Sequence, residues 1–201
     1  MNKTLSFFKE NRLLISRLVG LIIIALLLFS KPTIAADLTL NLILWSLSFI
    51  LVLICAFGRL WTLAYISGNK TMNLIEVGPY SMVRNPLYLF SLIGAIGIGI
   101  ASRNLPVLAL IVALFAFYYP FVIRAEEANL SHHHGASFAE FKARVPMFWP
   151  RFSQYKVPEY YEINTRLHRR SFFSACWFPL IYMAVVIIAV LHDNDLLPVL
   201  F

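Results

Sequence analysis

Charged residues are scarce in this sequence. Asp, Glu, Lys and Arg make up 13% of its 201 residues, whereas ordinary soluble domains carry about 25%. Hydrophobic residues make up 60%, and the mean hydropathy is +0.74. This composition excludes an ordinary soluble domain and predicts an integral membrane protein in contact with the lipid bilayer. The length fits a single domain.

Cysteine is also rare, and acidic residues are fewer than basic ones. The two cysteines, Cys55 and Cys176, both lie within apolar stretches, which indicates neither a disulfide framework nor a thiolate metal site. The formal net charge is +7. Membrane topology accounts for this excess, as described below, so we expect no nucleic-acid partner.

Five apolar stretches are long enough to enter a bilayer. They cover about 13–29, 38–57, 87–101, 105–123 and 172–191. Only Ser102-Arg103-Asn104 separates the third from the fourth, so these two must form a tight hairpin. The sequence therefore predicts an all-α membrane protein with five transmembrane helices, including a helical hairpin over about 87–123.

The basic residues orient these helices. With the N-terminus inside and five alternating spans, 15 of the 17 Lys and Arg residues lie on the inner side, leaving only Lys31 and Arg103 outside. The positive-inside rule favours this topology. We therefore expect a multi-pass protein whose N-terminus is cytosolic.

The spans and loops predict three segments. Residues 1–57 are expected to form a two-span scaffold, 58–152 a core that contains the hairpin, and 153–201 a linker followed by an additional C-terminal transmembrane helix. The polar residues that flank the hairpin on its inner side would meet at one membrane face, which is where a site is expected.

The first flanking stretch contains Gly78-Pro79-Tyr80 and Arg84-Asn85-Pro86-Leu87-Tyr88. Pro86 suits the first turn of a helix, and Asn85 then occupies the N-cap position. A helix N-terminus favours an anionic group such as a carboxylate, and Tyr88 on the first turn could reach the same place. Each feature alone also fits a plain helix start or an interfacial aromatic residue.

The second flanking stretch begins with two adjacent carboxylates, Glu126 and Glu127. On a helix they point about 100° apart, so only one can face a given pocket, and Leu130 shares the face of Glu126. Acids at the end of an apolar helix are costly and often functional. A solvated helix end, with a glutamate paired to Arg124, is the alternative.

Two further patterns follow. The run 132–134 is three consecutive histidines, which on a helix cannot all ligate one ion, so we predict no metal site. Residues 138–146 read as a short amphipathic helix ended by Pro146.

Taken together, the two stretches resemble the isoprenylcysteine carboxyl methyltransferase (ICMT) and phospholipid methyltransferase families. The resemblance covers about residues 70–152. It rests on Gly78-Pro79-Tyr80, Arg84-Asn85-Pro86-Leu87-Tyr88, Glu126-Glu127-x-x-Leu130, Gly135, Phe138, Phe141 and Val145-Pro146, in that order and separated by one hairpin.

The resemblance implies an S-adenosylmethionine-dependent enzyme with its site at the cytosolic face, beside a lipidic or other membrane-partitioned acceptor. Arg124 and Glu126 are the implied catalytic residues, with Arg124 orienting an anionic acceptor. The implied cofactor contacts are Asn73, Leu74, Ile75, Tyr80, Asn85, Pro86, Leu87, Tyr88 and Glu126.

One departure from the family pattern bears on the acceptor. Asn85 stands where the family has histidine, which removes a possible base. A carboxylate acceptor needs no base whereas an amine does, so an O- or S-methyl acceptor is favoured. The alternatives are a phospholipid N-methyltransferase, a sterol-type membrane reductase that uses NADPH, and a non-catalytic membrane binding module.

Overall fold

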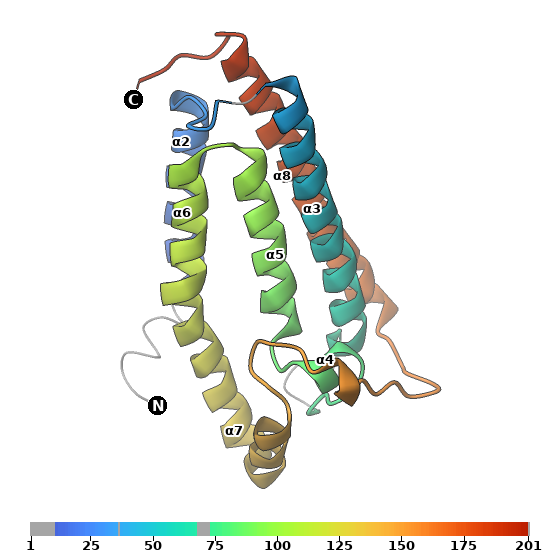
Figure 1. The fold of residues 1–201 in the computed structure, drawn as a ribbon. Helices are drawn as coiled ribbons and strands as arrows, with labels where there is room; N and C mark the ends of the chain where they lie inside the picture. Colours follow the sequence, from blue (N-terminus) through green and yellow to red (C-terminus); the bar gives the residue numbers. More distant parts are fainter. Residues whose placement is uncertain (1–10, 36, 68–72, 201) are drawn as a thin grey trace.

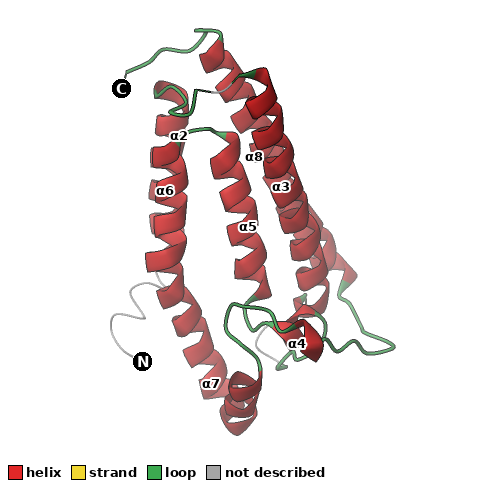
Figure 2. Cartoon of the chain, in the orientation of Figure 1, coloured by secondary structure: helices red, strands yellow, loops and turns green. Residues whose placement is uncertain are grey.

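The structure, a computed structural model, describes residues 11–35, 37–67 and 73–200, which form a bundle of long helices (Figure 1). The helices are α2 (Arg12–Phe29), α3 (Leu38–Ile66), α4 (Pro79–Met82), α5 (Pro86–Ala101), α6 (Leu105–Ala113), the π-helix η1 (Leu114–Tyr118), α7 (Tyr119–Arg144), the 3₁₀-helix η2 (Phe152–Gln154) and α8 (Thr165–Asp193). Apart from one antiparallel bridge between Gly78 and Lys156, the described residues contain only helices and loops (Figure 2). The all-α prediction is confirmed.

Three helical stretches are long and apolar enough to cross a membrane, namely Leu38–Ile66, Leu105–Arg144 and Thr165–Asp193. Less than a third of the apolar window in each is buried inside the protein, so most of this apolar surface faces outward, where lipid would cover it. The shorter helices α2 and α5 are also apolar. The 16 residues of α5 reach only about 24 Å, and the count of five spans stays a prediction.

Two helices extend beyond their predicted ends. Helix α3 runs on to Ile66, so residues 58–66 are helical and not loop as expected. Thr62 is tolerated there because its hydroxyl donates to the Gly58 carbonyl at 2.7 Å. Helix α8 begins at Thr165 within the predicted linker, where the Asn164 side chain accepts from the Leu167 N–H at 3.1 Å and caps the helix.

The chain runs back and forth between two ends of the bundle, and these ends differ in charge. Lys31 and Arg103, the two basic residues predicted outside, follow α2 and α5 at the end opposite α4 (Figure 1). The basic residues predicted inside lie in segments toward the other end, except that Lys3, Lys9 and Lys70 fall outside the described residues. Which end faces the cytosol stays a prediction.

Close packing of α5 on α3 depends on glycine. A Cβ added at Gly94 would lie 2.5 Å from the Cys55 sulfur, and one at Gly97 would lie 3.0 Å from the Ser48 carbonyl oxygen. Both distances are shorter than an ordinary contact. The glycines of α5 therefore allow the two helices to approach closely, as small residues do in membrane bundles.

We expect Gly94→Ala to lower the thermal stability of the protein in detergent, because the new methyl group must displace Cys55 and Phe178, at a cost of about 1–3 kcal/mol. Gly20→Ala in α2 is the matched control, since nothing lies within 4 Å of its added Cβ. Its melting temperature should be unchanged or higher, because alanine favours a helix over glycine. Equal melting temperatures for the two variants would contradict the packing argument.

Candidate functional site

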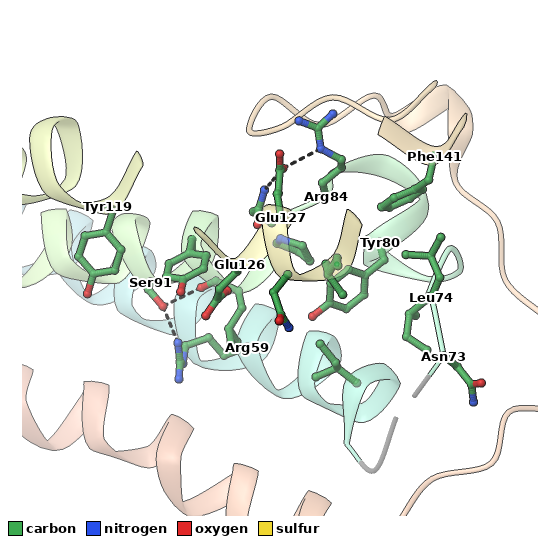
Figure 3. A pocket seen from close by; sticks show the side chains of 18 residues that line it. Arg59, Asn73, Leu74, Tyr80, Arg84, Ser91, Tyr119, Glu126, Glu127 and Phe141 are labelled. Carbon is green, nitrogen blue, oxygen red and sulfur yellow. Dashed lines mark hydrogen bonds and ion pairs between the residues drawn. The ribbon is translucent and has the colours of Figure 1, made fainter. Parts of the chain in front are cut away.

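A cavity of about 590 Å³ lies at the α4 end of the bundle, between α3, α5, α7 and the loop before α4. Its lining residues are Arg59, Ile66, Asn73, Leu74, Ile75, Tyr80, Arg84, Asn85, Pro86, Leu87, Tyr88, Ser91, Tyr119, Glu126, Glu127, Asn129, Leu130 and Phe141. All nine residues predicted to contact a cofactor are among them. The pocket thus joins the two motif stretches with the end of α3 (Figure 3).

A buried ion pair joins the two motif stretches. Arg84 Nε donates to Glu127 Oε1 at 2.9 Å, and the two side chains are only 9% and 8% exposed. The Asn85 amide donates to the same Glu127 oxygen at 3.3 Å and to the Met147 carbonyl at 3.2 Å. Lys142 lies 3.8 Å from the second Glu127 oxygen. Glu127 therefore holds the start of α5 against α7.

The segment after α7 is fixed by the same arginine. Arg84 Nη1 donates to the carbonyls of Lys142 and Val145, both at 2.8 Å, and the Arg84 N–H donates to the Pro146 carbonyl at 2.9 Å. Helix α7 ends at Arg144, as expected from Pro146, and the kink at Gly135 (φ 51°) separates its last turns. These bonds satisfy the carbonyls at the helix end.

Gly78 precedes and positions helix α4, which carries Tyr80. Its φ is +60°, a conformation that favours glycine, and its N–H donates to the Lys156 carbonyl at 2.7 Å. A Cβ added there would lie 2.5 Å from the Tyr65 ring. The Gly-Pro-Tyr motif is therefore needed to bring Tyr80 into the pocket wall.

Glu126 and Glu127 both line the cavity, so the prediction that only one of them can face a given pocket is wrong, although the two side chains point in different directions. Figure 3 shows Glu126 between Tyr80 and the Arg59–Ser91 pair, while Glu127 points toward Arg84. Burial raises the pKa of the Tyr80 phenol, and the Glu126 carboxylate raises it further, so the two groups interact across the cavity. Leu130, one turn after Glu126, also lines the cavity, as the helical spacing predicts.

Asn85 occupies the N-cap position of α5, but its side chain makes no capping hydrogen bond, because the amide donates to Glu127 and Met147 instead. The predicted capping role of this side chain is therefore wrong. Pro86 is in the first turn as predicted. Leu87 and Tyr88 follow it in the pocket wall, where the positive end of the helix dipole lies.

Arg59 forms the other end of the cavity, although it is not among the site residues predicted from the sequence. Its Nη1 donates to Ser91 Oγ on α5, and its Nη2 donates to Ser174 Oγ on α8 at 3.3 Å. The guanidinium lies 5.2 Å from the centre of the Phe178 ring. Among the described residues, no carboxylate forms an ion pair with it.

Two aromatic rings lie beside this end of the cavity. The centres of the Tyr88 and Tyr119 rings are 5.4 Å apart, and the two rings meet edge to face. Tyr119 follows the π-helix and its N–H bonds to the Leu114 carbonyl, five residues back. Pro120 has no N–H and would crowd a regular turn, so the wider turn accommodates it and sets where Tyr119 points.

The comparisons with known proteins cover most of the chain. The family model for phospholipid methyltransferases matches residues 34–137. The chain is 33% identical to the cobalt-zinc-cadmium resistance protein CzcN of Cupriavidus metallidurans, over 96% of this chain and 88% of that one. It is 35% identical to the nickel-cobalt-cadmium resistance protein NccN of Alcaligenes xylosoxydans xylosoxydans, over 69% of this chain and 64% of that one.

This chain belongs to the phospholipid methyltransferase family. The resemblance to membrane methyltransferases seen in the sequence is confirmed, and with the long apolar helices it makes this an integral membrane protein. The names of the two relatives state a resistance and not a reaction. No solved structure matches the chain.

One residue predicted to belong to the site, Arg124, does not line the cavity. It is exposed, so the structure does not bring it to the position expected for orienting an acceptor. A helical step of 100° per residue turns it away when Glu126 faces inward. Arg59, in contrast, lines the cavity.

The three consecutive histidines lie before the Gly135 kink. His132 and His133 are exposed, and the His133 ring bonds to the Asn129 carbonyl at 2.7 Å. In the described part of the chain, no group of three or more His, Cys, Asp or Glu side chains is arranged to hold a metal ion. The absence of a metal cofactor stays a prediction.

Proposed function

We propose that the cavity binds S-adenosylmethionine and that the protein transfers its methyl group to an acceptor that partitions into the membrane. One observation carries this proposal. The residues that the sequence predicts as cofactor contacts come from separate stretches, and all nine line one cavity in a member of the phospholipid methyltransferase family.

The lining suits this cofactor in size and chemistry. A volume of about 590 Å³ lies within the range of small-molecule sites, roughly 300–1,000 Å³. Leu74, Ile75 and Phe141 offer an apolar wall for an adenine ring. Glu126 offers a carboxylate for hydroxyl or amine donors, and the start of α5 suits a carboxylate.

The Tyr88 and Tyr119 rings form one wall of the cavity. When bound, the cofactor supplies an activated methyl group. The chain must then hold donor and acceptor in line and exclude water, which is the task of the buried side chains around Tyr80 and Glu126.

Arg59 bears on the choice of acceptor. Its guanidinium lines the cavity, and none of the ion pairs among the described residues involves it. A carboxylate acceptor would be attracted and an ammonium repelled. Asn85 is engaged in holding Glu127 and offers no base. A carboxylate or another O or S nucleophile is therefore the acceptor we propose.

We further propose that this end of the bundle faces the cytosol. The basic residues of the described segments gather there, and Lys31 and Arg103 lie at the opposite end. Of these two, Arg103 is buried and its guanidinium lies 2.6 Å from the Asp193 carboxylate. The positive-inside rule supports this orientation.

The experiment is to supply membranes that contain the protein with S-adenosylmethionine carrying a tritiated methyl group, beside membranes without it. We expect label in the lipid-soluble fraction that is released as volatile methanol by mild base, because base hydrolyses methyl esters. Base-stable label in a phospholipid headgroup would contradict the proposed acceptor and favour N-methylation. NADPH oxidation without methyl transfer would favour the reductase.

A further inference from the structure

The side chain of Arg59 contacts two residues of α8. Ser174 accepts a hydrogen bond from Nη2 at 3.3 Å, and the Phe178 ring lies under the guanidinium with its centre 5.2 Å away. Ser91 on α5 accepts from Nη1. The guanidinium is thus held by two neighbouring helices while it lines the cavity.

Phe178 is itself fixed in place. It packs against the hydrophobic core of the bundle, and a Cβ added at Gly94 would lie 2.8 Å from its ring. The ring therefore fills the space that the glycine leaves on α5. Because Phe178 cannot move away without opening a cavity, it holds the guanidinium stacked on its face.

Ser91 is also fixed, by a hydrogen bond within its own helix. Its hydroxyl donates to the Leu87 carbonyl at 2.7 Å, so its oxygen lone pairs are left to accept from Arg59. An unbraced arginine has many rotamers, and fixing one costs free energy at the moment a ligand binds. Bracing by Ser91, Ser174 and Phe178 lowers that cost, which is the usual benefit of a preorganised site.

The match to the family model ends at residue 137, so α8 lies outside the matched residues. We propose that α8 supports the acceptor half of the pocket through Arg59, with Ser174 and Phe178 as positioning residues that hold the Arg59 side chain ready for an anionic acceptor group. This proposal rests on the proposed function, since it takes the Arg59 end of the cavity as the acceptor end. It assigns the C-terminal helix a role in the site in addition to membrane anchoring.

The test uses the full chain in a neutral detergent and dodecanoate labelled with ¹³C at its carboxyl carbon, a single-chain lipid carboxylate whose resonance reports contact with a guanidinium. We expect saturable binding by the unmodified protein. Phe178→Leu and Ser174→Ala should each weaken it by about three- to tenfold, the effect of losing one cation–π contact or one charged hydrogen bond. Phe178→Tyr, which keeps an aromatic face, should bind almost as well as the unmodified protein.

Trp177→Leu is the matched control, because Trp177 is 62% exposed on the same turn of α8. Its affinity should not change. Arg59→Gln should bind weakly, and adding Phe178→Leu to it should cause no further loss, since a positioning residue acts only through the group it positions. A general loss of packing would instead be additive.

The proposal is overturned if Phe178→Leu and Ser174→Ala bind dodecanoate as the unmodified protein does, or if their effect persists fully in the Arg59→Gln background. Titration of the same variants with S-adenosylmethionine separates the two proposals. If the unmodified protein does not bind S-adenosylmethionine, the proposed function is overturned. The dodecanoate series still decides whether α8 holds Arg59.

Discussion

Replacing Glu127 by alanine is expected to destabilise the protein by about 3–5 kcal/mol, because it leaves the Arg84 guanidinium buried without its counter-charge. The Arg84 side chain is only 9% exposed in the structure. The Asn85 amide would lose an acceptor as well. The expected result is a large fall in the melting temperature in detergent. Intrinsic fluorescence measures this unfolding.

Glu140→Ala provides the control on the same helix, since Glu140 is exposed and its loss should have little effect. The double variant Arg84→Met with Glu127→Leu should be less damaging than Glu127→Ala alone, because it removes both charges and fills the space with apolar atoms. If Glu127→Ala melted like Glu140→Ala, the ion pair would not be what holds the two motif stretches together.

Replacing Glu126 by glutamine is expected to weaken binding of S-adenosylmethionine by about 10- to 100-fold, the loss of a charged hydrogen bond inside a shielded pocket. Stability should change little, because the Arg84 pair is made by Glu127. Calorimetric titration of folded protein measures the affinity, and Glu140→Gln is the matched control.

The roles assigned to the two adjacent glutamates would be contradicted if a Glu127 variant stayed folded but did not bind the cofactor, while Glu126→Gln still bound it. In the structure Glu127 is 8% exposed and paired with Arg84, and Glu126 faces Tyr80 and the Arg59–Ser91 pair (Figure 3). Removing the Glu127 carboxylate is therefore expected to lower stability, and removing the Glu126 carboxylate to lower the affinity for the cofactor.

Much of the pocket wall could be predicted from the sequence, because its parts carry local signals. Asn85-Pro86 marks a helix start, and helical spacing places Leu130 on the face of Glu126. The order of the motifs around a hairpin supplies the rest through the resemblance. All nine cofactor contacts that the resemblance implies line the cavity.

The remaining features depend on contacts between distant residues. Arg84 and Glu127 are 43 residues apart, and no local pattern pairs them. Arg59 could have been found, since a cation inside an apolar helix is itself a functional signal. It was placed in a loop because the predicted span ended at residue 57, whereas α3 continues to Ile66. Arg124 is instead the arginine that the family resemblance implies, and the structure leaves it exposed and outside the cavity lining.

The central claim is that this pocket binds S-adenosylmethionine. The most direct measurement is calorimetric titration of the purified, folded protein with S-adenosylmethionine, S-adenosylhomocysteine and NADPH. We expect saturable binding of the first two and none of NADPH. Binding of NADPH alone, or of none of the three, would contradict the claim, the former in favour of a reductase and the latter in favour of a binding module without this cofactor.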